Sequence, residues 1–416
     1  MFAVKDRAVW GHTRTLFLGS AVLFLINIFF GFDNALTVGA LPRSQLLIHL
    51  HGGSIGWITL SLIGIAVWLF TGEREVSESY ANGIRTLTRV AIPVFGAYII
   101  SFGLAFSLRG MFILLPIFGT ASMLLIWVAA IFALRQLRHL PVVTTTHVLV
   151  AGGLLVAAVG ATMGVMLGLE RVAGQFLPIV GEDRVGLHAG MMDTYLIIVA
   201  GAIVEWFVSK DPGGRRTAAG VVQGVAWSVA AILVPIAYLT NTLSALLPIF
   251  VLLLFLGLIV FMVRSGWRGL TTNPFGSGAK PWAFFGTFWM VVFVGLFIWA
   301  ATAFVEDFSL APAWFFTVFA HAAFVGTMTN LLLGVYSVRT QASSSVMAWG
   351  EPAARWLINL GLLAFFALKI ASDTRLGAIV MGIGVLLGVF TMIRRLLASG
   401  AAMGMEKRAA PAMGAD

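Results

Sequence analysis

The chain has 416 residues, of which 60% are hydrophobic and only 10% are charged, and it contains no cysteine. Soluble domains carry about 25% charged residues, so the composition excludes an ordinary soluble domain and predicts an all-α integral membrane protein. The net charge is +9, but the basic residues are scattered through short loops, and no nucleic-acid partner is expected. Without cysteine, His and Met remain as the soft metal ligands.

Apolar runs long enough to cross a lipid bilayer recur along the whole chain. A bilayer core needs roughly 20 apolar residues per helix, and about twelve runs meet that length. They lie near 16–38, 45–70, 88–108, 111–134, 145–168, 186–208, 219–240, 244–263, 283–304, 313–337, 354–371 and 376–398. The first run has no small-residue cleavage site after it and is expected to be an anchor. We therefore expect a multi-pass protein of the bacterial inner (cytoplasmic) membrane.

The basic residues are distributed unevenly between the two sides of these runs. With the N-terminus inside, about 20 of the 26 Lys and Arg residues fall in cytoplasmic segments. The outer loops hold only about five, which are Arg43, Arg109, Arg171, Arg184 and Arg375, and Lys369 can snorkel. This bias predicts that both termini are cytoplasmic. We expect one transmembrane domain over residues 1–400 and a short cytoplasmic tail over 401–416.

Four of the seven histidines lie in the outer third of predicted spans that run from outside to inside. His49 and His51 belong to the second span, His188 to the sixth and His321 to the tenth. The interval along the chain from His51 to His188 is nearly the same as the interval from His188 to His321. This regular spacing predicts three four-helix units about a pseudo-threefold axis, near 15–140, 141–268 and 280–400.

A histidine inside a membrane is costly without a partner, so these four residues are functional candidates. A hydrogen bond to a neighbouring carbonyl near the interface is the simpler alternative for any one of them. Imidazole is also the commonest protein ligand for metal ions and binds haem iron. Four histidines at matched depth in matched spans favour a ligand role.

Three stretches around these histidines carry a resemblance to a known family. They are PRSQLLIHLHGGSIGW at 42–57, GLHAGMMDTYLIIVAGAIVEWFVSK at 186–210 and FAHAAFVGTMTNLLLGV at 319–335. Together they resemble subunit I of the haem–copper oxidase superfamily, and are most similar to its nitric oxide reductase and NnrS-like members. The resemblance implies twelve helices in three arcs, with cytoplasmic termini.

The resemblance implies a b-type haem between the second and tenth spans. His51 is the better match to the second-span ligand because small residues follow it, and His321 matches the tenth-span ligand. His49, about 200° away around the helix, is left as an alternative ligand. Arg43 is a candidate partner for a haem propionate, or else a plain interfacial arginine. Trp57 is a candidate to pack on the porphyrin face.

The resemblance also implies copper at His188. Met192 lies four residues after His188 and shares its helix face, so the two could hold a soft Cu(I) ion, with His49 as a further ligand. Ordinary packing is the alternative explanation for Met192. The family's other ligands are missing, because Phe319 replaces the high-spin haem ligand and no histidine occurs in AILVPIAYLTN at 231–241.

The retained ligands predict a haem-binding, oxidase-like membrane protein that acts in electron transfer or in metabolism related to NO or copper. An electron donor or a partner subunit is then expected. Two alternatives remain open at this point. One is an active terminal oxidase or NO reductase with an unusual site. The other is a transporter for copper or a small solute.

Overall fold

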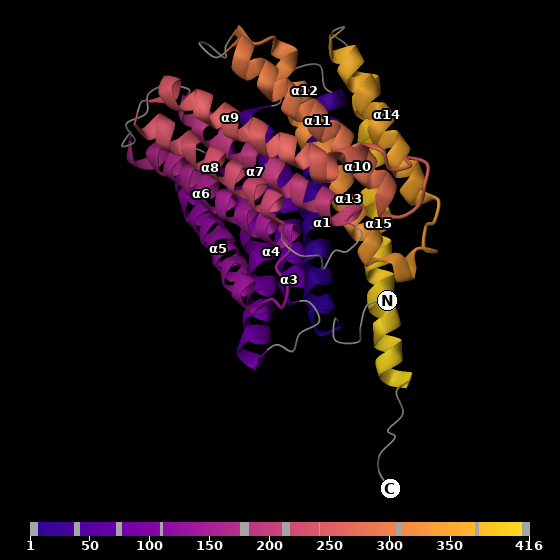
Figure 1. Cartoon of the computed structure of the whole chain (residues 1–416). Helices are drawn as coiled ribbons and strands as arrows, with labels where there is room; N and C mark the ends of the chain where they lie inside the picture. The colour runs from indigo at the N-terminus through magenta and orange to yellow at the C-terminus, as the bar shows by residue number, and fades with distance from the viewer. Residues whose placement is uncertain are drawn as a thin grey trace.

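The computed structural model describes residues 7–36, 42–71, 77–108, 111–174, 183–209, 217–240, 242–304, 310–370 and 374–409. Within these ranges the secondary structure is helical and no strand occurs. Twelve helical segments there are long and apolar enough to cross a membrane, which confirms the number of predicted spans. Figure 1 shows them as one bundle, with α14 and α15 on the side opposite α5 and α6.

The helices follow the predicted runs closely. The first six spans are α1 (Arg7–Leu36), α2 (Arg43–His51) with η2 (Gly52–Thr59) and α3 (Leu60–Thr71), α4 (Glu78–Ser107), α5 (Leu114–Gln136), α6 (Thr145–Ala173) and α7 (Asp183–Val208). The last six are α8 (Ala218–Leu239), α9 (Leu243–Phe261) with η5 (Met262–Gly266) and α10 (Trp267–Leu270), α11 (Ala279–Ala303), α12 (Ala313–His321) with η7 (Ala322–Thr329) and α13 (Asn330–Arg339), α14 (Gly350–Ile370) and α15 (Arg375–Ala409). Short turns of 3-10 helix are η3 (Met111–Ile113), η4 (Leu137–His139) and η8 (Gln341–Ser343). The expected tail begins inside α15, and its residues 410–416 lie outside the described residues.

The second and tenth spans share an unusual construction. Each begins after a proline in extended conformation, Pro42 (φ −51°, ψ 143°) or Pro312 (φ −54°, ψ 140°). Each then runs as a nine-residue α-helix that ends at a histidine and continues as an eight-residue π-helix. The π-helices pack against each other, and Nε1 of Trp57 donates a hydrogen bond of 3.2 Å to Oγ1 of Thr329 between them. Such π-helical turns often occur at functional sites.

A buried ion pair joins the last spans. Glu351 on α14 lies 2.5 Å from the guanidinium of Arg395 on α15, and it also accepts hydrogen bonds from Trp282 (3.0 Å) and Ser337 (2.7 Å). Arg395 is 2% exposed and donates further bonds to two backbone carbonyls. Because both charges are paired and hydrogen-bonded, the cost of burying them is offset.

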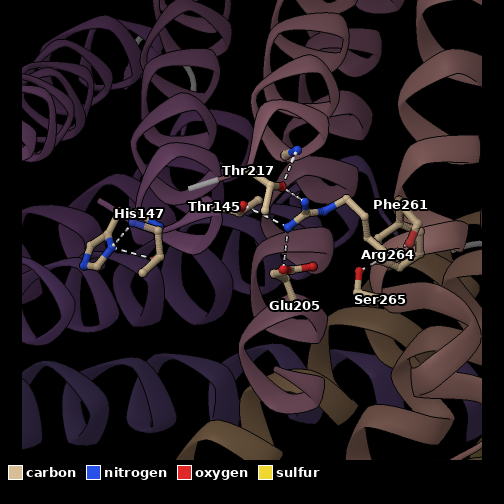
Figure 2. A network of polar contacts seen from close by, with 9 residues as sticks. Thr145, His147, Glu205, Thr217, Phe261, Arg264 and Ser265 are labelled. Carbon is tan, nitrogen blue, oxygen red and sulfur yellow. Dashed lines mark hydrogen bonds and ion pairs between the residues drawn. The ribbon is translucent and has the colours of Figure 1, made fainter. Parts of the chain in front are cut away.

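A second polar network lies near the predicted cytoplasmic end of the sixth and eighth spans (Figure 2). The guanidinium of Arg264 in η5 donates to Oε1 of Glu205 at 2.7 Å and to Oγ1 of Thr145 at 3.0 Å. It also donates to Oγ1 of Thr217, just before α8. These contacts hold the ends of α6, α7 and α8 around η5, far along the helices from the four histidines.

Candidate functional site

The four histidines share one feature of hydrogen bonding. Their Nδ1 atoms lie beside the backbone carbonyl oxygens of Asn27 (His49, 3.0 Å), Leu47 (His51, 2.8 Å), Gly160 (His188, 2.9 Å) and Thr317 (His321, 2.7 Å). A carbonyl only accepts, so each Nδ1 donates and the neutral ring carries its lone pair on Nε2. No residue in the described ranges hydrogen-bonds to these four Nε2 atoms. This arrangement orients an imidazole as a metal or haem ligand.

His147 shows the contrasting, structural use of a histidine. Its Nδ1 accepts a hydrogen bond of 3.1 Å from the backbone N–H of Thr144, and Thr144 in turn caps the start of α6. Its Nε2 lies 3.3 Å from the carbonyl oxygen of Leu69, to which it donates. Figure 2 shows this ring beside α6, next to the Arg264 network. Both ring nitrogens are engaged, so His147 has no lone pair for a ligand.

His49 is held against the first span. In addition to the Nδ1 bond to the Asn27 carbonyl, the Asn27 amide donates to the carbonyl oxygen of His49. A methyl group added at Gly31, one turn after Asn27, would lie 3.1 Å from Cε1 of His49. The missing side chain at Gly31 therefore lets the imidazole approach α1 closely.

His321 ends α12, at the start of the π-helix η7 that packs against η2. Its ring is close enough to interact electrostatically with His49 and with the ammonium group of Lys369 on α14. It packs on Phe365, with ring centroids 4.7 Å apart. The second and tenth spans pack together through η2 and η7, so His49 and His321 belong to neighbouring spans.

His51 and His188 form a second pair. Both rings line one cavity and interact electrostatically with each other. The His51 ring stacks on Phe102 at 4.0 Å and 23°. The His188 ring lies against Gly164, where an added methyl group would be 2.9 Å from Cε1.

The cavity between His51 and His188 is bounded by the second to sixth spans. Its lining is mostly small and apolar and includes Met192, Ser122 and Tyr98. About 30 Å³ of the cavity is open to the centre of a water-sized sphere. The hydroxyl of Ser122 is buried there without a hydrogen-bond partner among the described residues. His49 does not line this cavity, so the predicted metal ligands His188 and Met192 are joined there by His51.

The two pairs have the same local construction. His49 and His188 each donate to a carbonyl on the preceding span and lie on the glycine four residues further along that span. His51 and His321 each donate to the carbonyl four residues earlier in their own helix. They also stack or pack on a phenylalanine of the following span, Phe102 and Phe365 respectively.

A third position of the same kind carries no histidine. Phe319 on α12 packs on Phe293 and Phe297 of α11, with ring centroids 4.9 Å and 6.2 Å apart. Phe293 and Phe297 are one turn apart on the preceding span, as Asn27 and Gly31 are beside His49. Aromatic side chains fill this position.

The remaining predicted residues lie outside both pairs. Trp57 is 1% exposed, stacks on Phe24 at 4.6 Å and 7°, and bonds Thr329, so it holds α1, η2 and η7 together. Arg43 is exposed at the start of α2, with its guanidinium 5.7 Å from the ring centroid of Phe106. Neither contact involves a candidate ligand.

The residues that orient the histidines were not predicted from the sequence. Asn27 and Gly31 position His49, and Gly160 and Gly164 position His188. The signal was present, because the interval from Asn27 to Gly160 is the same as the interval from Gly31 to Gly164 and close to the histidine spacing. Among the described residues no three His, Asp or Glu side chains cluster as a metal-ion site.

No protein-family model matches the chain, and no curated protein is similar enough to count as a relative.

Proposed function

We propose that the chain is a membrane-embedded haem protein that acts in electron transfer, with a b-type haem between His49 and His321. One observation carries the proposal: the two imidazoles come from spans that pack together through η2 and η7, and their Nδ1 hydrogen bonds leave both Nε2 lone pairs free. The choice left open between His49 and His51 therefore falls on His49. When bound, the haem would supply one-electron redox chemistry.

The surroundings of this pair favour a haem over a bare metal ion. The ammonium group of Lys369 repels a cation but can pair with the carboxylate of a propionate. Phe365 offers an apolar ring beside His321. Lys369 replaces Arg43 as the proposed propionate partner, because Arg43 lies over Phe106.

Electron transfer is favoured over reduction of O₂ or NO. His49 and His321 would both hold the haem, and a haem held by two histidines would supply one-electron transfer. In the resemblance the high-spin haem ligand belongs at Phe319, and that side chain is packed in an aromatic cluster with Phe293 and Phe297. The alternative of an active oxidase or NO reductase therefore lacks its second metal centre.

We further propose three four-helix units about a pseudo-threefold axis, with both termini cytoplasmic, in a bacterial-type inner membrane. Equivalent contacts on the first span of each unit support the repeat. Asn27, Gly160 and Phe293 follow one another at equal intervals along the chain. In that order, they contact residues of the second span of their own unit, which are His49, His188 and Phe319. The predominance of Lys and Arg on one side supports the orientation.

A reduced-minus-oxidised optical spectrum of the purified full-length chain tests the proposal. We expect a low-spin b-type signal that is lost in His49→Leu and in His321→Leu and kept in His51→Leu. Leucine is a suitable replacement because the hydrogen bonds of these rings go to carbonyls that already belong to helices. Absence of haem in the wild-type protein would refute the proposal and favour a transporter. Loss of the signal in His51→Leu with retention in His49→Leu would move the haem to the ligands first expected from the resemblance.

A further inference from the structure

We infer that the start of α11 is a binding site for the phosphate group of an anionic phospholipid, with Arg355 of α14 as its buried cation. Lys369, which interacts electrostatically with His321, is at the other end of α14. It lies about 21 Å along the helix from Arg355. This site is therefore separate from the proposed haem and does not depend on it.

The first turn of α11 presents backbone donors and no acidic side chain. The first N–H groups of a helix have no partner within the helix, and they attract anions. Gly278, the residue before α11, makes no side-chain cap, and no Asp or Glu lies in the first turn. Ser277, Gly278 and Lys280 are exposed, so an anion from outside the protein can reach this turn.

Arg355 is a buried cation beside this turn. The residue is 3% exposed, and its Nη2 donates a hydrogen bond of 3.2 Å to the carbonyl oxygen of Gly276, just before Ser277 and Gly278. Its Nε is buried without a hydrogen-bond partner in the described part of the chain. Buried polar groups normally have a partner, so this nitrogen indicates an acceptor that comes from a ligand.

The charges around Arg355 include two buried cations and one carboxylate. Glu351, one turn earlier on α14, forms its ion pair with Arg395 at 2.5 Å and accepts further hydrogen bonds from Trp282 and Ser337. It interacts electrostatically with Arg355, but its hydrogen bonds go to the other three side chains. A second negative charge at this place would therefore offset the cost of burying Arg355.

The position of this turn along the spans favours a lipid headgroup over a soluble phosphate. The apolar span Ala245–Leu270 ends just before it, and the spans Ala279–Ala300 and Gly350–Lys369 both begin here. Lipid headgroups lie at the level where apolar spans end. Phe275 is 77% exposed and packs on Trp356, with ring centroids 5.2 Å apart, and tryptophan is typical of the membrane interface.

The charge of the segment favours an anionic lipid over a zwitterionic one. Residues 262–282 contain Arg264, Arg268 and Lys280 and no acidic residue. Basic pockets between spans on the cytoplasmic side bind anionic headgroups, and the proposed orientation places this turn on that side. The phosphate of such a lipid supplies both the acceptor and the negative charge that Arg355 lacks.

A lipid titration of the delipidated full-length chain in nonionic detergent tests this site. We expect the wild type to bind phosphatidylglycerol at one site and more tightly than phosphatidylcholine. Arg355→Gln loses a hydrogen bond to a charged group and should weaken phosphatidylglycerol binding about tenfold or more. Lys280→Gln removes an exposed charge and should weaken it about fivefold. Arg85→Gln is the matched control, because Arg85 is equally exposed but belongs to α4, and it should bind as the wild type does.

Ala279→Asp tests the same site by adding a charge. Ala279 is the first residue of α11, where a carboxylate is favourable for the helix but repels a phosphate, so binding of phosphatidylglycerol should fall to that of phosphatidylcholine. Size-exclusion profiles identify any variant that fails to fold, and Ala279→Asp still tests the site if Arg355→Gln does not fold. Equal binding of the two lipids by the wild type, or an equal loss in Arg85→Gln, overturns the inference. Inorganic phosphate that displaces phosphatidylglycerol at equal concentration also overturns it, since the site would then hold a soluble anion.

Discussion

Gly164→Ala should weaken binding of Cu(I) at His188, where the resemblance to the oxidase superfamily implies copper, without removing any candidate ligand side chain. The added methyl group would lie 2.9 Å from Cε1 and 3.2 Å from Nδ1 of His188, whereas ordinary carbon contacts begin at about 3.5 Å. The ring must therefore move by roughly half an ångström, away from its 2.9 Å hydrogen bond to the Gly160 carbonyl. Overpacking of this kind costs about 1–3 kcal/mol. If the whole of that cost falls on the metal-bound state, binding becomes roughly 5- to 150-fold weaker.

Gly31→Ala is the matched variant for the first pair. Its methyl group would lie 3.1 Å from Cε1 of His49, so the ring moves less and we expect the smaller end of the same range, roughly 5-fold, in haem affinity. Gly295→Ala is the control, because Gly295 lies in α11 with no atom within 4 Å of an added methyl group. It should leave the affinities for haem and Cu(I) unchanged. Helix propensity favours alanine at this position by about 1 kcal/mol.

The assay is a pair of titrations, haem and Cu(I), on each of the three glycine variants. If the two histidine pairs are independent, Gly164→Ala lowers the affinity for Cu(I) alone and Gly31→Ala lowers the affinity for haem alone. If either variant lowers both affinities equally, or if Gly295→Ala does so, the two histidine pairs are not independent sites oriented by these glycines.

Three other substitutions have expected outcomes of their own. Glu351→Ala leaves Arg395 buried without its carboxylate and should lower the free energy of unfolding by about 3–5 kcal/mol; an unchanged thermal midpoint would contradict the buried ion pair. Arg264→Leu leaves Glu205 without its cation and should lower the free energy of unfolding by about 1–2 kcal/mol. The measurement is the thermal midpoint at several ionic strengths, which should be lower than that of the wild type. His147→Ala removes a capping contact and should cost about 1 kcal/mol with haem and copper content unchanged; loss of either cofactor would show that His147 is more than structural.

The spans were predictable because lipid imposes a simple condition on sequence. A helix that crosses the hydrocarbon core must be apolar over roughly 20 residues, and this condition can be read without knowing any contact. The twelve predicted runs and the twelve apolar helices therefore agree. The π-helices η2 and η7 were not predictable in this way, since GGSIGWIT and AAFVGTMT have the same apolar character as α-helical stretches elsewhere in the chain.

The pairing of the histidines could be predicted only in part. Their depth follows from span positions, but the neighbour that each ring meets depends on how the helices are rotated in the bundle. His49 and His51 are about 200° apart on α2, so one faces α1 and the other faces the cavity. Sequence alone did not say which of them meets His321. Trp57 shows the same limit, because its ring packs on Phe24 rather than beside a ligand.

The spacing of two residues on α2 explains how one helix can serve two sites. Side chains at positions i and i+4 share a face of a helix, so histidines at that spacing would both point into one site. Side chains at i and i+2 point to nearly opposite faces, which places His49 with His321 and His51 with His188. The tenth span keeps the same register but has Phe319 where α2 has His49. That span therefore contributes one histidine, to the first pair, and aromatic side chains pack at its other position.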